Sequence, residues 1–174
     1  MLVKTEAQGT LAAMSGFITS LRKSFQHQVD RHHNLPFLKA TMAACALVAT
    51  ADGHVSFSES VRVDQIVETL DQLKTFDPHE AVDLFKDYCD TILKNPKEGH
   101  QEVLRELEPA MENRETSELL IRICLAVAES NGETSLVDQI EIVTLCSLLD
   151  VDPSGFGLYK EALAEQAKAS GLQI

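Results

Sequence analysis

Acidic and amide side chains gather at two short turns of the sequence, and oxygen atoms of this kind are the ligands that Ca²⁺ and Mg²⁺ prefer. Asp52 follows a long apolar segment, so we expect it at the carboxyl end of a buried helix, where the helix dipole adds about half a negative charge. A bound cation would relieve that repulsion. The two turns therefore predict a site for a divalent cation, Ca²⁺ or Mg²⁺ rather than Zn²⁺, at Asp52, Glu59, Glu129, Asn131 and Asp138, with Glu133 beside them.

The same residues also have a purely structural interpretation. Asp-Gly and Asn-Gly commonly end helices. Ser56 with Glu59, like Ser135 with Asp138, has the spacing of a capping box at the start of a helix. The spacing does not fit an EF-hand loop, which needs acidic residues at alternate positions and a glutamate at the twelfth. The cation site and the helix caps both stay open at this point.

Patterns typical of enzymes are absent from the sequence. It contains no GxSxG nucleophile elbow, no glycine-rich phosphate loop and no HExxH motif. His27, His32 and His33 lack the spacing of four residues that zinc ligands need on one helix, and His54 stands by itself. We therefore expect a protein that is not an enzyme.

Composition and charge limit the class of protein further. The 174 residues are 44% hydrophobic and 5% aromatic, and they carry a formal net charge of −12. Residues 1–40 hold a balance of +3, so residues 41–174 carry −15. An acidic surface disfavours nucleic acid and attracts cations or basic proteins. The cysteines form no CxxC pair and lie in apolar helical patterns, which is typical of buried reduced thiols in the cytoplasm: Cys45, Cys89, Cys124 and Cys146.

The hydrophobic periodicity predicts helices throughout and no sheet. An apolar stripe from Leu11 to Phe25 indicates an amphipathic helix ending near residue 33, and Asn34 is expected to cap the next helix. Residues 37–51 are apolar nearly all round, as in a central helix. Pro96 is expected to mark the end of one helix and Pro109 to close or kink another.

The second half of the sequence repeats the first. When the chain is shifted by 79 residues, residues 45–70 align with residues 124–149 without a gap, so that cysteines, turn glycines and capping serines coincide. A third helix begins with Asp-Pro in each half, at Asp77 and Asp152. The pattern predicts an all-α bundle of seven to eight helices, made of two three-helix repeats related by a pseudo-two-fold axis.

The repeated turns resemble a known family. The segment from Val48 to Glu59, VATADGHVSFSE, is similar to the signature of the TerB family of tellurite-resistance proteins, which is close to ADGxVSxxE. The segment from Val127 to Asp138, VAESNGETSLVD, is similar to the second copy in that family, with Asn131 at the position of the family's aspartate. The resemblance runs from about residue 37 to about residue 158.

Several expectations follow from this resemblance. It implies a helical bundle without known catalytic activity, divalent-cation binding by acidic residues near the turns, and a cytoplasmic role in tellurite and general stress beside membrane-bound partners. We expect a duplicated TerB-like domain over residues 35–174, preceded by an arm and amphipathic helix over residues 1–34. The alternative function is a protein–protein scaffold that uses the acidic surface, with the turns serving only as helix caps.

The partners expected from the sequence are other proteins, including membrane-associated ones, and not nucleic acid. No segment is long and apolar enough to span a membrane. Three roles stay open for the amphipathic segment before residue 34. It packs on the bundle, pairs with a second copy in a homodimer, or lies on anionic lipid.

Overall fold

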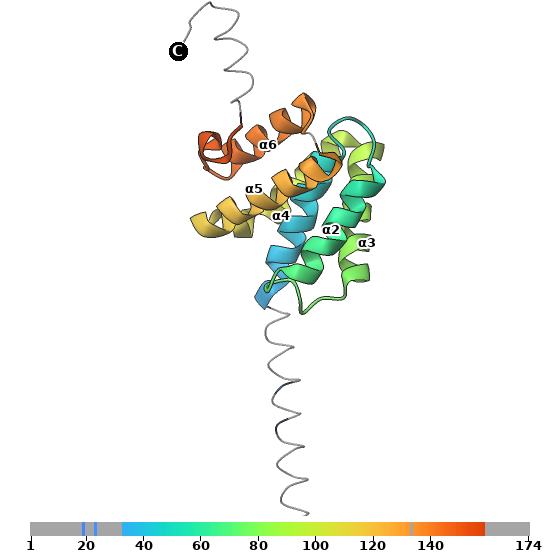
Figure 1. The fold of residues 1–174 in the computed structure, drawn as a ribbon, viewed down its shortest axis with the longest axis vertical. Coiled ribbons are helices and arrows are strands. Elements are labelled where there is room, and N and C mark those ends of the chain that lie inside the picture. Colours follow the sequence, from blue (N-terminus) through green and yellow to red (C-terminus); the bar gives the residue numbers. More distant parts are fainter. Residues whose placement is uncertain (1–18, 20–22, 24–32, 133, 159–174) are drawn as a thin grey trace, which may run out of the picture. The chain divides into compact units, whose positions relative to one another are not determined.

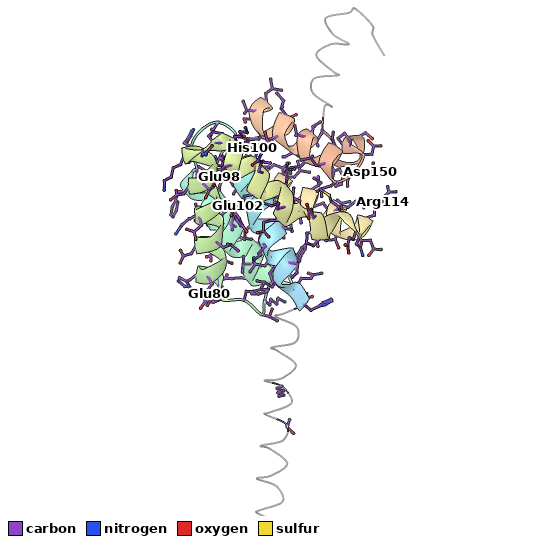
Figure 2. All side chains as sticks on the ribbon, turned by 180° about the vertical axis from the view of Figure 1, so that it is seen from behind. Glu80, Glu98, His100, Glu102, Arg114 and Asp150 are labelled. Atoms are coloured by element: carbon purple, nitrogen blue, oxygen red, sulfur yellow. The ribbon has the colours of Figure 1, made fainter. Side chains whose placement is uncertain are left out.

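The computed structural model describes residues 19, 23, 33–132 and 134–158, and these residues form helices and turns without a strand (Figure 1). The chain divides into two compact units, Met1–Leu35 and Pro36–Ile174. Residues 33–132 and 134–158 contain six α-helices and two 3-10 helices. The all-α class is therefore confirmed for the described residues. The total of seven to eight helices stays a prediction, because most of the expected first helix and the segment after residue 158 lie outside them.

The apolar segment predicted as a central helix is helical over residues 33–49, and nearly every side chain from Leu38 to Thr50 is buried. The Thr50 hydroxyl donates a hydrogen bond of 2.7 Å to the carbonyl of Ala46 and closes the last turn. Asn34 was expected to cap this helix, and that prediction is wrong. Residues 33 and 34 are already helical, whereas a capping residue has an extended backbone.

Three helices follow along the chain: α2 (Phe57–Thr69), α3 (Pro78–Lys94) and α4 (Pro96–Met111). α3 packs against both α2 and α4. Pro96 does mark the end of α3, since it is the first residue of α4. Pro109 does not close α4, because the helix continues to Met111. The missing N–H of a proline costs only one hydrogen bond, and here it falls in the last turn.

A glycine sets the close approach of α4 to α3. A Cβ atom placed on Gly99 would lie 2.5 Å from the Cα of Ile92, a distance that real Cβ atoms do not reach. Gly99 therefore lets the α4 backbone contact the α3 backbone directly.

The last elements are α5 (Arg114–Ala128), the 3-10 helix η1 (Glu129–Asn131), α6 (Leu136–Leu148) and the 3-10 helix η2 (Pro153–Phe156). α5 packs against α2, α4 and α6, and η1 packs against α2 and α5. A longer helix was expected after Asp152. The described residues instead form η2, which ends at Gly157 in the left-handed conformation with φ 74°. Residues 159–174 lie outside the description.

The outer face of α6 is unusual for so acidic a protein. Six residues of this helix are exposed and none of them is charged: Leu136, Val137, Ile140, Thr144, Ser147 and Leu148. The inner face packs into the core through Ile142, Leu145 and Cys146. The exposed positions of α6 are thus uncharged and mostly apolar, and its charged residues, Asp138 and Glu141, are half-buried.

Candidate functional site: two paired turns

The first turn connects the central helix to α2. Gly53 has φ 91°, the left-handed conformation that ends a helix without steric cost to glycine. The Asp52 carboxylate accepts a hydrogen bond of 3.1 Å from the backbone N–H of His54, and the His54 imidazole Nδ1 lies 3.1 Å from the same oxygen. Ser56 then caps α2: its hydroxyl accepts from the Glu59 N–H at 3.2 Å, and the Glu59 carboxylate accepts from the Ser56 N–H at 2.7 Å.

The second turn, between α5 and α6, has the same local structure. Gly132 also has φ 91°. Ser135 caps α6 by accepting from the Asp138 N–H at 3.1 Å, and the Asp138 carboxylate accepts from the Ser135 N–H at 3.2 Å. The capping boxes predicted from the sequence are therefore confirmed in both turns. Each one fixes the position of a carboxylate at the start of a helix.

The two turns meet in space. The Ser58 hydroxyl, in the first turn of α2, donates a hydrogen bond to the amide oxygen of Asn131 in η1, although the two residues are 73 positions apart. Ser58 is a site residue that the sequence did not reveal, because nothing in its neighbourhood indicates a partner in the other half of the chain. The contact joins the first turn of one capped helix to the residue before the turn glycine of the other.

The electrostatics of Glu59 show that the acidic groups of the two turns are close. Glu59 is the single charged residue that is buried among the described residues, with 8% of its surface exposed. Burial raises the pKa of its carboxyl group above the ordinary 4.5, and the hydrogen bonds from Ser56 oppose this shift. The charges of Asp138 and Asp52 raise the pKa further. Carboxylates from both turns thus share one electrostatic environment.

One observation at the paired turns favours a bound cation, and another limits how it could be held. The Ser130 hydroxyl oxygen, next to Asn131, is buried without a hydrogen-bond partner in the structure, and a buried polar atom of this kind calls for a ligand or water. Within the described part of the chain, however, no three His, Cys, Asp or Glu side chains are grouped so that they could hold a metal ion. A cation would therefore need side-chain rotation, or water molecules to complete its shell.

Not every predicted site residue joins the pair of turns. The structure brings together Asp52, Glu59 and Asp138 through their charges and Asn131 through Ser58. Glu129 is exposed at the start of η1, where its backbone carbonyl accepts from the Gly132 N–H at 2.9 Å. No hydrogen bond or ion pair joins its carboxylate to the other site residues within the described part of the chain. Glu133 lies outside the described residues.

The cysteines lie in the core, as predicted. All four are buried. The pKa of Cys45 is raised well above its usual value by a hydrogen bond with Cys124 and by burial. Burial also raises the pKa of Cys89 to about 12 and that of Cys146 to about 11. Such thiols stay protonated at neutral pH, which makes them poor nucleophiles and poor metal ligands.

The described helices also bear on membrane association. None of the helices in the described ranges combines the length and the apolar character that a bilayer-spanning helix requires.

The described residues and the site define a helical protein in which two capped turns from distant segments are joined.

Comparison with known proteins identifies the family. The family model described as tellurite resistance protein TerB matches residues 38–161, and the chain belongs to this family. A protein from Alcaligenes sp. described as tellurium resistance protein TerB is 26% identical over 110 residues, which cover 63% of this chain and 90% of the relative. No solved structure matches the chain. The resemblance expected from the two turn segments is confirmed.

Proposed function

We propose that this protein is a non-enzymatic, cytoplasmic module of a tellurite-resistance-like stress response, and that it binds a divalent cation at the paired turns. The family match and the relative described as a tellurium resistance protein support the first part. The cation is Ca²⁺ or Mg²⁺, because the groups at the turns are carboxylate, amide and hydroxyl oxygens. Glu59, Asp138, Asp52 and Asn131 would supply ligands, with Glu129 a more distant contributor.

The observation that carries the cation proposal is the meeting of the two turns, where the Ser58 hydroxyl donates a hydrogen bond to Asn131 and Glu59 is buried near carboxylates of both turns. A buried carboxylate that feels two further carboxylates from both turns is held at an energetic cost. A divalent cation between them would remove the repulsion and restore the ordinary preference for the ionised form. The orphaned Ser130 hydroxyl lies in the same η1 segment and is a further oxygen in need of a partner.

We also propose that residues 35–174 form one duplicated domain of two three-helix repeats around a pseudo-two-fold axis. α2 and α6 support this, since both have 13 residues and their bounds differ by the 79-residue shift of the sequence alignment. The proximity of the Cys45 and Cys124 thiols, which raises the pKa of Cys45, is further support. These cysteines are aligned by the same shift, and equivalent residues touch each other where they lie on a two-fold axis.

Thermal unfolding of chelator-treated protein, with and without Ca²⁺, Mg²⁺, Mn²⁺ and Zn²⁺, tests the cation site. An ion at a hundred times its Kd should stabilise the fold by about 2.7 kcal/mol, which corresponds to roughly 5–10 °C for a chain of this size. Glu59→Gln and Asp138→Asn should each remove most of the ion-induced shift. Absence of a shift with every ion would refute the cation site and leave the turns as helix caps.

A matched control separates a specific site from general attraction to an acidic protein. Asp87 is exposed on α3 and belongs to neither turn, and Asp87→Asn removes one negative charge as Asp138→Asn does. The ion-induced shift should persist in Asp87→Asn. Equal losses in both variants would mean that the ions respond to the net charge.

The second candidate function is a scaffold whose acidic surface binds another protein, including a membrane-associated one. Large apolar side chains exposed on α2 favour it, above all Phe57, of which 85% is exposed. An aromatic ring left in water on a folded domain commonly marks a protein contact.

A further inference from the structure

A groove runs along the seam between α2 and α3. It consists of two hollows of about 370 Å³ and 500 Å³, and Phe57, Ser60 and Lys86 line both of them. The first hollow extends past Val61 to His79, and the second extends to Leu93 and to the first turn, residues 53–56. Because the hollows share three residues, they are neighbouring parts of one groove. On α3 the groove reaches from His79 to Leu93, about 21 Å at the helical rise of 1.5 Å per residue.

The inner surface of the groove is apolar and accessible. Phe57 is 85% exposed, Leu93 is 43% exposed and Val61 is 37% exposed. Val82 lines the first hollow, and Phe85 lines the second from the core side. Several large apolar side chains in one groove, with the most exposed of them shared by both hollows, form a continuous apolar strip.

Most of the charged side chains of the groove are acidic, and His54 and His79 line it as well. Asp64 and Asp83 line the first hollow and Asp90 lines the second, against the single ammonium group of Lys86. The Lys86 Nζ lies 3.7 Å from the Asp83 carboxylate, so part of its charge is already balanced. The groove therefore presents an apolar strip with a negative edge, and it favours an occupant with apolar and basic groups.

The shape of the groove favours a helix as the occupant. Its lining residues on α3 come from each successive turn of the helix, at positions 79, 82, 83, 85, 86, 89, 90 and 93. Two packed helices with such ridges leave a channel into which the ridge of a third helix fits. A peptide that binds by adding a β-strand would instead need a strand edge, and the described residues contain no strand.

We propose that the α2–α3 groove binds an amphipathic helix of a partner protein, with an apolar stripe over Phe57 and Val61 and Lys or Arg residues facing Asp64, Asp83 and Asp90. This proposal rests on the scaffold function; the groove borders the first turn, but binding of the helix needs no bound cation. About four turns of such a helix would fill the groove. A second copy of the chain is a less favourable occupant, because residues 41–174 carry −15 and would face the same negative edge.

A designed peptide tests the groove without knowledge of the natural partner. The probe is a fluorescently labelled 18-residue helix of leucine and lysine with all leucines on one face, and a leucine–glutamate peptide of the same pattern is its control. Anisotropy titrations in chelator at two salt concentrations give the affinities. The full chain should bind the lysine peptide and not the glutamate peptide, with weaker binding at the higher salt concentration.

Matched variants locate the binding surface. Phe57→Ser should weaken binding about tenfold or more through the loss of ring contact. Leu136→Ser is the control, since Leu136 is 68% exposed at the equivalent position of α6 and does not line the groove. It should bind as the parent does. Both side chains are largely in solvent, so both variants should keep the parent's melting temperature.

The other outcomes overturn the proposal in distinguishable ways. Binding that is unchanged in Phe57→Ser, or weakened equally in Leu136→Ser, would place the contact elsewhere on the acidic surface and leave the scaffold function standing. If the lysine peptide did not bind at all, both the groove proposal and the scaffold function would be overturned. Sedimentation velocity showing a dimer of the parent that Phe57→Ser dissociates would make the groove a contact between copies of this chain.

Discussion

Replacing Gly99 by alanine should destabilise the protein, although alanine is the better helix former. The added Cβ would lie 2.5 Å from the Cα of Ile92 and 2.8 Å from its backbone nitrogen. Carbon atoms in contact prefer about 3.5–4.0 Å. Backbone atoms cannot rotate away as a side chain can, so α4 would have to move by about 1 Å from α3.

The magnitude follows from two opposing effects. Alanine in place of glycine inside a helix gains about 1 kcal/mol. Overpacking a tight contact costs about 1–3 kcal/mol, and a contact with backbone belongs at the upper end. The net loss should therefore be about 1–2 kcal/mol, or roughly 2–8 °C in melting temperature.

Urea unfolding and thermal melting measure this loss, with Gly155→Ala as the control. A Cβ on Gly155 would have no atom within 4 Å, and its backbone needs no positive φ. This variant should be neutral or slightly more stable than the parent. If Gly99→Ala is as stable as the parent or more stable, helix propensity outweighs packing and the direct contact of α3 with α4 is wrong.

Two further predictions concern titratable groups. The pKa of Glu59 in the folded protein is raised above 4.5, so the unfolded chain loses this proton at lower pH than the folded protein does. The contribution of Glu59 to the free energy of unfolding therefore falls as pH rises from 4.5 through the folded pKa. Glu59→Gln keeps an acceptor for the Ser56 N–H, so its stability relative to the parent should be higher at pH 7 than at pH 4 in urea titrations; an equal difference at both pH values would contradict this. The buried thiols with raised pKa, such as Cys89, should react with a thiol reagent only at the rate of opening of the fold, and fast labelling of native protein at pH 7.5 would show that they are accessible.

Local features of the structure could be predicted from the sequence. The capping boxes at Ser56 and Ser135 and the left-handed glycines depend on residues within a few positions of each other, so their spacing is enough to place them. The central helix was predictable because a segment that is apolar all round can only be buried. The positions of the helix ends were less certain. Asn34 lies inside a helix, and Pro109 is accommodated in a last turn.

The candidate site depends on contacts that a single sequence does not contain. The hydrogen bond from Ser58 to Asn131 and the effect of Asp138 on Glu59 arise from the packing of α2 against η1. The sequence placed acidic residues at each turn and left open whether the turns meet. The groove could not be predicted from the sequence either. Phe57 directly follows the residue that caps α2, and the local pattern does not reveal that α3 leaves the Phe57 ring uncovered.

The uncharged outer face of α6 has a consequence for behaviour in concentrated solution. Repulsion between molecules of net charge −12 keeps copies apart at low ionic strength, but its range shrinks to about 8 Å at physiological salt. The attraction between exposed Leu136, Val137 and Ile140 side chains does not weaken with salt. The solubility of the protein should therefore fall as salt is added, and Ile140 in the centre of that face is the position where one new charge would best prevent precipitation.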